Sequence, residues 1–332
     1  MPVTVIVGGQ FGSEGKGKVT HYLAEKMAAT YVIRVGGSNS GHTVVDDAGT
    51  TRIFRHLPTA AILPTPHLII PAGSYLDLDV LFEEIERASI SAKRLSISPQ
   101  AVLITPQCKN AEKQSSLTQI GSTQSGTGAA VLARIQRSPK DVLFAKDCEA
   151  LKPYVADIPS LLRSALAKHE RVIIEGTQGF GLSLLHSSTY PYVTSRDTTA
   201  AAFVAEAGVS PLDVDDIVLV LRAYPIRVAG TSGPLPNETT WEVLSQQAHT
   251  SLEERTSVTK KIRRVAHFDA DIVRQAISVN NPTRIVLNHV DYLHKDIRID
   301  SPQLKEFILN IERQIEHPVN LIGLSPKDLY IF

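Results

Sequence analysis

The sequence contains no apolar run long enough for a membrane helix, few cysteines, and no excess of charge of either sign. A membrane-spanning helix needs about 18 or more consecutive apolar residues, and no stretch of this chain approaches that length. The chain carries 34 Lys and Arg against 34 Asp and Glu, so its formal net charge is zero. A neutral protein lacks the basic field expected of one whose main partner is DNA or a membrane surface. We therefore expect neither a nucleic acid nor a membrane as a direct partner.

The two cysteines, Cys108 and Cys148, are far apart in the sequence and form no CxxC or Cys/His spacing. This excludes a disulfide framework and a zinc site, and it indicates reduced, buried thiols in a cytoplasmic protein. The N-terminus has the pattern of a strand rather than that of a secretion signal. Length alone suggests about two domains. No linker, repeat or low-complexity segment divides the chain, so we expect one domain over residues 1–332.

Apolar runs rich in β-branched residues recur along the chain, each followed by a turn and a helix-like segment. The runs are continuous rather than alternating, which is typical of strands that are covered on both faces. The pattern predicts an α/β fold with a large, mainly parallel central sheet flanked by helices. The predicted strands are 3–7, 31–35, 171–174, 216–221 and 284–287. The predicted helices are 16–28, 78–88, 158–168, 199–206, 240–247, 269–279 and 301–316.

A glycine-rich segment, GQFGSEGKGK at 9–18, follows the first predicted strand and opens the first predicted helix. Glycines allow a tight turn in which backbone N–H groups and the helix N-terminus face an anion, and lysines add positive charge. From Gly12 the spacing satisfies GxxxxGK, but Val19 follows where a P-loop has Ser or Thr. The pattern predicts a P-loop-like phosphate site. The simpler alternative is a strand-to-helix turn with lysines facing solvent.

This segment is similar to the GQWGDEGKGK signature of the adenylosuccinate synthetases. That family joins the amino group of aspartate to C6 of a purine nucleotide, and a nucleoside triphosphate activates the C6 oxygen. The resemblance implies a catalytic role for Lys16, and Ser13 stands where the family has a catalytic Asp. The implied triphosphate-binding residues in this segment are Gly12, Ser13, Glu14, Gly15, Lys16, Gly17 and Lys18.

A second segment, GGSNSGHT at 36–43, resembles the GGxNAGHT segment of the same family. On composition alone it would be an ordinary loop. The resemblance places Asn39 near the purine monophosphate and Thr43 near the triphosphate. It also gives His42 the role of donating to the phosphoryl group in transfer. Mg²⁺ is the implied cofactor, held by the Gly41 carbonyl and Ser13.

Three further segments resemble the family's monophosphate site. GSTQSGTG at 121–128 is similar to TTGRGIG and implies a monophosphate contact from Thr123, with Ser125 in place of the family's arginine. EGTQG at 175–179 and TYPYVTS at 189–195 imply that Gln178 faces the purine and that Thr194 contacts the monophosphate. Arg137 stands where the family has an arginine that reaches the monophosphate of the neighbouring subunit. The resemblance therefore implies a homodimer.

The segment TSVTKKIRR at 256–264 is similar to the family's aspartate-binding loop, TTGRxRR. An arginine presents a planar fork to a carboxylate, whereas a lysine makes a point contact. The resemblance implies aspartate binding by Ser257, Val258, Thr259 and Arg263. Lys261 replaces an arginine that lies near the ribose, so it belongs to the implied purine nucleotide site. The alternative is a solvated basic loop.

Two segments correspond to the family's guanine-binding elements for GTP. NHVD at 288–291 takes the place of TKLD, so Asn288 and Asp291 are implied triphosphate-binding residues while His289 replaces the lysine. GLSPK at 323–327 replaces the STGP-type loop and implies a contact from Ser325. Because both elements are altered, specificity for guanine does not carry over.

Ser13 changes the expected chemistry, because a hydroxyl is too weak a base to take the N1 proton of the purine unaided. The chain has either lost activity or acts on a purine for which a carboxylate at this position is unsuitable. Guanine carries a 2-amino group beside N1, and a serine leaves room for that group and can accept a hydrogen bond from it. A mismatched wall would cost about 1–3 kcal/mol. The proton acceptor stays open among Gln178, a water and the transferred phosphate.

The small residue at position 13 resembles the viral branch of the family, which acts on dGMP with ATP on the way to 2-aminoadenine DNA. The expected reaction joins dGMP and L-aspartate, with ATP converted to ADP and phosphate, giving N6-succino-2-amino-2′-deoxyadenylate. A viral protein of this kind would act in the host cell cytoplasm. The first alternative is an adenylosuccinate synthetase that uses IMP and GTP. The second is a nucleotide-binding regulator with a degenerate active site.

Overall fold

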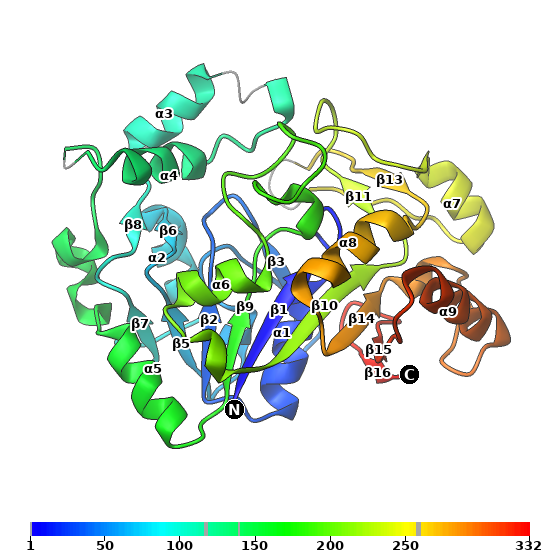
Figure 1. Ribbon diagram of the computed structural model, residues 1–332, viewed down its shortest axis with the longest axis horizontal. Coiled ribbons are helices and arrows are strands. Elements are labelled where there is room, and N and C mark those ends of the chain that lie inside the picture. The colour runs from blue at the N-terminus through cyan, green and yellow to red at the C-terminus, as the bar shows by residue number, and fades with distance from the viewer. Residues whose placement is uncertain (1, 116–118, 139, 257–259) are drawn as a thin grey trace.

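The structure is a computed structural model that describes residues 2–115, 119–138, 140–256 and 260–332. Within these ranges the largest sheet has nine strands in the order β16-β15-β14-β10-β1-β9-β2-β5-β7 (Figure 1). Its strands are β1 (Val3–Gly8), β2 (Tyr31–Arg34), β5 (His67–Ile70), β7 (Leu95–Ile97), β9 (Val172–Glu175), β10 (Val214–Arg222), β14 (Arg284–Asn288), β15 (Leu321–Ile322) and β16 (Tyr330–Ile331).

The strand β1 lies near the middle of this sheet and pairs in parallel with both β10 and β9. All six of its residues are buried, which explains why its sequence is continuously apolar rather than alternating. The other pairings in the sheet are also parallel except that of β15 with β16 at one edge. The carboxyl ends of the parallel strands therefore meet at one edge, where ligands bind in open α/β sheets.

Helices cover both faces of the sheet. α1 and α2 pack on one face, and α5, α6, α8 and α9 pack on the other, as the membership of the hydrophobic clusters shows. The helices of the described ranges are α1 (Lys16–Lys26), α2 (Leu78–Arg87), α3 (Pro106–Gln114), α4 (Thr127–Gln136), α5 (Ile158–Ala167), α6 (Ala200–Ala207), α7 (Trp241–Ala248), α8 (Ala270–Asn280) and α9 (Pro302–Ile315). None of them is long and apolar enough to cross a membrane.

Smaller elements extend from the carboxyl edge of the sheet. In Figure 1 the N-terminus lies at the bottom, and α3 and α4 gather at the upper left while β11, β13 and α7 gather at the upper right. These two groups therefore lie on either side of the edge at which β1, β9 and β10 end. The small sheets pair β3 (His42–Val45) with β4 (Thr51–Phe54), β6 (Tyr75–Leu76) with β8 (Val102–Leu103), and β13 (Arg264–Ala266) with β11 (Ile226–Arg227) and β12 (Glu238–Thr239).

The predicted α/β class and the mainly parallel sheet are confirmed. Each predicted strand and helix exists, and its observed ends differ by no more than two residues. Several helix starts lie one residue later than predicted because the first residue is the N-cap, as Thr199, Thr240 and Asp269 are. The prediction omitted β5, β7, β15 and β16 of this sheet, the strands of the smaller sheets, and the helices α3 and α4. The four strands of the main sheet are only two to four residues long, and α3 is strongly polar, so none gave a clear period.

Candidate active site

The glycine loop connects β1 to α1 at the centre of the carboxyl edge. Gly12, Ser13 and Gly15 all adopt left-handed backbone conformations, with φ of 90°, 57° and 92°. A Cβ at Gly15 would lie 2.7 Å from the Asn288 side-chain nitrogen, so only glycine fits there. No side chain caps the first turn of α1 at Gly15. Its backbone N–H groups are therefore available to an anion, as the sequence predicts.

Glu14 and Lys16 form a buried ion pair inside this loop. The Glu14 carboxylate lies 2.6 Å from Lys16 Nζ, and it accepts hydrogen bonds from the backbone N–H of Gly12 at 2.8 Å and of Gln10 at 3.2 Å. The Glu14 side chain is fully buried. It thus shapes the loop and orients Lys16 toward the carboxyl edge, rather than contacting a ligand itself.

His42 lies at the start of β3, in contact with buried charged residues of the central strands. Its Nδ1 is 2.5 Å from Glu175 Oε1, and Arg34 Nη1 is 2.8 Å from the same nitrogen. Thr59 donates its backbone N–H and its hydroxyl to the other Glu175 oxygen, at 2.8 Å and 3.1 Å. The Thr59 hydroxyl also lies 2.8 Å from the carbonyl of Gly17. This network fixes the imidazole beside the first turn of α1.

Burial controls the protonation of this network. Burial, with help from the charges of Arg34 and Lys16, lowers the pKa of His42 well below its usual value. Burial raises the pKa of Glu175 to about 7. The imidazole is therefore neutral at neutral pH and has a single N–H to donate, so it can donate to a phosphoryl group from Nε2 only when protonated Glu175 donates to Nδ1. Perturbed groups of this kind are typical of functional sites.

Ser13 and Gln178 lie on neighbouring turns. A Cβ at Gly12 would lie 3.9 Å from the Cα of Gln178, so the glycine loop touches the turn after β9. Ser13 is exposed, and Gln178 Oε1 is buried without a hydrogen-bond partner in the described part of the chain. Gln178 has a positive φ of 51°. The predicted contacts of Ser13 and Gln178 with the purine stay predictions.

The predicted monophosphate segments meet around α4. A Cβ at Gly37 would lie 2.6 Å from the Thr127 methyl group, and one at Gly128 would lie 3.6 Å from Ser195 Cβ. The backbone N–H groups of Gly126 and Gly128 are bonded to the buried carboxylate of Glu112, at 2.7 Å and 2.6 Å. The loops that carry Asn39, Thr123 and Thr194 are thus neighbours. Asn39 and Thr194 are half-buried, and Thr123 is exposed.

Arg137 lies at the opposite end of α4 from this cluster. It is exposed and follows a ten-residue helix, so it stands about 15 Å from the N-terminus of α4 at 1.5 Å per residue. Leu132 and Ile135 are also exposed on this helix, at 56% and 67%. Arg137 is therefore not directed to the site of its own chain. This placement is compatible with the predicted contact across a dimer, which stays a prediction.

Of the predicted aspartate-binding residues, Ser257, Val258 and Thr259 lie outside the described residues. Arg263 is half-buried, and its carbonyl accepts a hydrogen bond from the indole of Trp241 at 2.7 Å. Burial lowers the pKa of Arg263. Lys261 is exposed, so its side chain could contact a ribose only if the bound nucleotide extended to this part of the surface.

The predicted base-binding residues are tied to the glycine loop. Asn288 is fully buried, and its side-chain nitrogen donates to the Glu14 carbonyl at 2.8 Å. Lys18 Nζ donates to the Ser325 carbonyl at 2.8 Å rather than facing the loop's open side. Burial lowers the pKa of Lys18 to about 8 and raises the pKa of Asp291 to about 6. The segments that carry Asn288 and Ser325 are therefore hydrogen-bonded directly to the glycine loop and to the first turn of α1.

Five charged residues that help to build this site were not predicted from the sequence. Arg34, Glu175, Arg222 and Glu112 are almost completely buried, and Glu254 pairs with Arg222. Two of these residues could have been recognised from the sequence, because Arg34 interrupts an apolar run and Arg222 ends one. A charged residue in a buried strand needs a partner, although the sequence does not show which partner it has.

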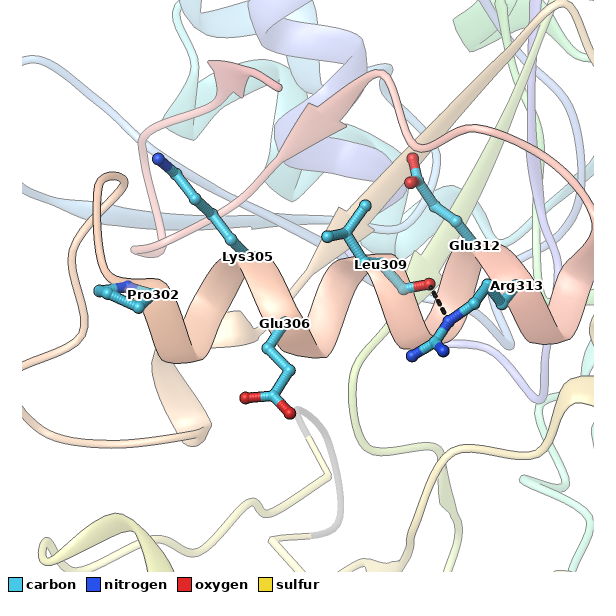
Figure 2. Close-up of a pocket in the computed structure, with 6 residues that line it drawn as sticks. All are labelled: Pro302, Lys305, Glu306, Leu309, Glu312 and Arg313. Atoms are coloured by element: carbon cyan, nitrogen blue, oxygen red, sulfur yellow. Dashed lines mark hydrogen bonds between the residues drawn. The ribbon is translucent and has the colours of Figure 1, made fainter.

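A shallow hollow also lies along the outer side of α9, and all six residues that line it belong to that helix (Figure 2). Lys305 and Glu306 point to opposite sides of the helix, and the side chains do not converge on a common point. Arg313 donates to the Leu309 carbonyl of its own helix at 3.3 Å. None of the predicted site residues lies here, so we do not assign the active site to this surface.

The donor set for Mg²⁺ consists of neutral oxygens. In the described residues no group of three or more His, Cys, Asp or Glu side chains could hold a metal ion. Mg²⁺ is often bound through one or two protein oxygens together with substrate phosphates and waters. The Gly41 carbonyl and the exposed Ser13 fit an ion that arrives with a polyphosphate, and Ser13 lies in the loop whose N–H groups would hold those phosphates.

Comparisons with known proteins agree along the whole chain. Residues 5–147 and 143–301 match the family model described as adenylosuccinate synthetase. The adenylosuccinate synthetase of Thermococcus onnurineus is 37% identical, covering 98% of this chain and 97% of the relative. That of Archaeoglobus fulgidus is 35% identical, with 98% and 96% covered.

Solved structures agree as well. The succinoaminodeoxyadenylate synthetase of cyanophage S-2L, bound to dGMP and to dATP as an energy donor, superposes with a TM-score of 0.85. It is 31% identical, with 99% of this chain and 95% of that chain covered. The fully ligated adenylosuccinate synthetase of Plasmodium falciparum has a TM-score of 0.88 with full coverage of both chains. At 20% identity this second likeness concerns the fold alone.

Proposed function

Because this chain belongs to the adenylosuccinate synthetase family, whose members are nucleoside triphosphate-dependent carbon–nitrogen ligases, we propose that its purine substrate is dGMP. The family condenses L-aspartate with a purine nucleotide. In the proposed reaction the product is N6-succino-2-amino-2′-deoxyadenylate, and the triphosphate is converted to its diphosphate and phosphate. The observation that carries the choice of dGMP is Ser13.

The C6 oxygen of a 6-oxopurine is a poor leaving group, so the ligase first transfers the γ-phosphoryl group to it. The aspartate amine then displaces phosphate. Phosphoryl transfer depends mainly on positioning and on charge stabilisation. We assign these tasks to the open N–H groups of the glycine loop, to Lys16 as oriented by Glu14, and to His42 as fixed by Glu175.

Ser13 supports dGMP as the substrate because the aspartate that the family has at this position would occupy the space of the 2-amino group of guanine. The exposed Ser13 side chain and the unpaired Gln178 oxygen lie on adjacent turns that face the proposed purine site. The 2-amino group of guanine lies beside N1, on the edge that a carboxylate at position 13 would occupy. A serine leaves space for this group and can accept its hydrogen bond. The cyanophage relative, which binds dGMP, supports the same substrate.

We propose ATP or dATP as the phosphoryl donor. His289 replaces the lysine that helps to hold guanine in the family, and burial lowers the pKa of this histidine to about 3, so it is uncharged at neutral pH. The cyanophage relative uses dATP as its energy donor. Asn288, Asp291 and Ser325 line the proposed base site on the basis of the family resemblance.

Mg²⁺ fits the proposed site when it is carried by the triphosphate. The Gly41 carbonyl and Ser13 would hold it, and its chemistry there is the neutralisation of charge on the β- and γ-phosphates. We also propose that the active unit is a homodimer in which Arg137 reaches the partner's monophosphate. The exposed Leu132 and Ile135 beside it support an interface on α4.

A second candidate is an adenylosuccinate synthetase that uses IMP and GTP. The sequence relatives favour it, because the archaeal synthetases are 37% and 35% identical to this chain and the cyanophage enzyme is 31% identical. Overall identity supports IMP more strongly, whereas position 13 supports dGMP.

Phosphate release by the purified protein tests the proposed function. Reactions would contain Mg²⁺, either dGMP or IMP, and either ATP or GTP, each with and without L-aspartate. We expect release only when aspartate, dGMP and ATP are present together. Release with IMP but not with dGMP would establish the second candidate. Nucleotide binding without aspartate-dependent release would instead indicate a regulator.

A further inference from the structure

Arg222 is a fully buried arginine at the carboxyl end of β10, one strand away from the end of β1. Its Nη1 donates to the carbonyl of Ser13 at 3.0 Å, and its guanidinium also binds the carboxylate of Glu254. The backbone N–H and carbonyl of Arg222 are both bonded to the side chain of Gln10, at 2.9 Å and 3.1 Å. The backbone of Arg222 is thus bonded to Gln10 at the start of the glycine loop, and its side chain is bonded to Ser13 within the same loop.

Glu254 lies two residues before the segment that resembles the aspartate loop. Its carboxylate accepts a hydrogen bond from the Tyr292 hydroxyl at 2.8 Å, and its carbonyl accepts one from the Arg263 backbone N–H at 2.8 Å. Burial opposes its charge, but Arg222 nearby outweighs burial and lowers the pKa of Glu254 to about 2. The two side chains therefore form an ion pair at neutral pH.

We propose that the Arg222–Glu254 ion pair is a positioning device that joins the phosphate loop to the amino-acid loop. It fixes the carbonyl of residue 13 relative to the segment that carries Arg263, so the reacting phosphoryl group and the aspartate amine meet in the correct relative placement. Arg222 and Glu254 act through Ser13 and Arg263 rather than on the substrates. The proposal rests on the proposed function, in that the second loop binds L-aspartate.

The other contacts of the two loops indicate which substrate should respond. The glycine loop keeps its shape through Glu14 and through Asn288, whose hydrogen bonds among the described residues do not involve Glu254. The segment around Arg263 depends on Glu254 at one end and on Trp241 and β13 at the other. Loss of the ion pair should therefore weaken aspartate binding much more than triphosphate binding.

The test compares Glu254→Gln with a matched control, Asp216→Asn. Glu254→Gln keeps the size of the side chain and removes its charge. Asp216 lies at the amino end of the same strand, β10, and pairs with Arg284, and its carboxylate is 13% exposed against 21% for Glu254. The control therefore breaks an ion pair whose carboxylate has a similar exposure, although its arginine is 30% exposed, and this pair lies at the opposite end of the strand from the loops. Tyr292→Phe is a milder variant that removes one hydrogen bond from Glu254 and leaves the charges intact.

In steady-state assays with the purine that the wild type accepts, Glu254→Gln should raise the KM for aspartate at least tenfold. The KM values for the purine and the triphosphate should change less than threefold, and Tyr292→Phe should raise the KM for aspartate by a smaller factor. Asp216→Asn should change none of the three KM values. An unchanged aspartate KM in Glu254→Gln, or an equal rise in all three KM values, would overturn the proposal, since a merely structural role lowers the amount of active enzyme without this selectivity.

A second readout does not depend on turnover. Trp241 is the only tryptophan in the sequence, and it donates to the Arg263 carbonyl. Addition of Mg²⁺ and ATP should change its fluorescence in the wild type and in Asp216→Asn, but not in Glu254→Gln. If the wild type lacks aspartate-dependent phosphate release while this pattern is observed, the proposed function fails and the coupling of the loops stands. Fluorescence that is insensitive to ATP in the wild type, or equally sensitive in Glu254→Gln, would contradict the coupling.

Discussion

At the scale of single residues, the proposed choice of purine rests on position 13. The backbone of Ser13 is in the left-handed region, and its carbonyl accepts a hydrogen bond from Arg222 of β10. The main chain at position 13 is therefore fixed by the turn and by this hydrogen bond. The side chain is exposed and projects from this fixed point. A change of side chain there alters the purine site while leaving the cradle for the phosphates in place. Because the side chain at position 13 and the phosphate-binding main chain of the loop can change independently, we infer that members of one family can accept different purines.

The first prediction concerns the replacement Ser13→Asp. We expect kcat/KM for dGMP to fall by about tenfold or more, because an aspartate removes the space beside the 2-amino group, which corresponds to ~1.4 kcal/mol or more. Asp tolerates the left-handed conformation, so the backbone should not be strained. The measurement is phosphate release at varied dGMP.

Ser13→Gly is the control for this prediction. It also fits the left-handed conformation and keeps the space, but it lacks the hydroxyl. A Ser13→Gly variant that keeps dGMP turnover while Ser13→Asp loses it would assign the effect to space. Unchanged dGMP turnover in Ser13→Asp would refute the steric argument.

At the scale of elements, short segments between strands are fixed by buried side chains from distant helices. The chain between β4 and the helical turn at Thr59–Ile62 provides an example. Glu84 of α2 accepts hydrogen bonds from the backbone N–H groups of His56 and Leu57, at 3.0 Å and 2.9 Å. The ring of His56 in turn accepts one from the backbone N–H of Asp77 at 3.1 Å. This segment leads directly to Thr59, which holds Glu175.

The second prediction follows from His56. Burial, together with nearby arginines, lowers the pKa of His56 to about 3 in the folded protein. The unfolded chain takes up this proton near pH 6.5 and the folded chain does not, so the free energy of unfolding falls as the pH drops below 6.5. Between pH 7 and pH 5 this one ring should cost about 2 kcal/mol.

Urea unfolding of the wild type and His56→Gln at pH 7 and pH 5 checks this expectation. The glutamine amide oxygen can take the place of Nε2 and accept the hydrogen bond from Asp77, but it does not titrate. The variant should therefore lose about 2 kcal/mol less than the wild type on acidification. Equal losses in both proteins would show that His56 takes no part in the acid sensitivity.

The elements also show how far the sequence was informative. Helices such as α9 were predicted because their apolar positions repeat at the helical period and Leu304, Ile308, Ile311 and Ile315 are buried. α4 was not predicted, because its start is the glycine-rich stretch Gly-Thr-Gly, and its N-terminus is stabilised by Glu112 from another helix. A stabilising contact of this kind is tertiary and leaves no local signal.

The same reasoning applies to the site. The glycine loop, His42 and Gln178 were predicted from motifs that are continuous in the sequence, and the structure brings their segments to one edge of the sheet. The pair Arg222 and Glu254 was not predicted, because the two residues are 32 positions apart and neither belongs to a motif. Sequence patterns identify groups that face a ligand more readily than the buried groups that orient them.

At the scale of the whole molecule, the central sheet takes strands from β1 to β16, so almost the full length of the chain contributes to one sheet. The neutral overall charge hides a local concentration of cations at the carboxyl edge, including Lys16, Lys18 and Arg263, each of which is at least partly buried. Small anionic substrates are the ligands that such an edge can attract.

The third prediction concerns the proposed dimer. If Arg137 acts across the interface, mixing Arg137→Ala with Lys16→Ala should restore activity that neither variant has alone. Random exchange makes about half of the dimers mixed, and each mixed dimer has one intact site, so about a quarter of wild-type activity should return. The measurement is phosphate release after the two inactive proteins are mixed and allowed to exchange subunits.

Ile135→Glu is the complementary variant, because it places a charge on the exposed apolar side of α4. It should shift the protein to a monomer in analytical ultracentrifugation and lower the activity. No recovery of activity in a mixture that does exchange subunits would place Arg137 outside the active site.

A competition experiment tests whether this ligase acts on dGMP, as we propose. The wild type would receive equal concentrations of dGMP and IMP with L-aspartate, Mg²⁺, ATP and GTP, and the products would be identified by mass spectrometry. We expect N6-succino-2-amino-2′-deoxyadenylate to be the main product. Adenylosuccinate as the main product would show that dGMP is not the preferred substrate.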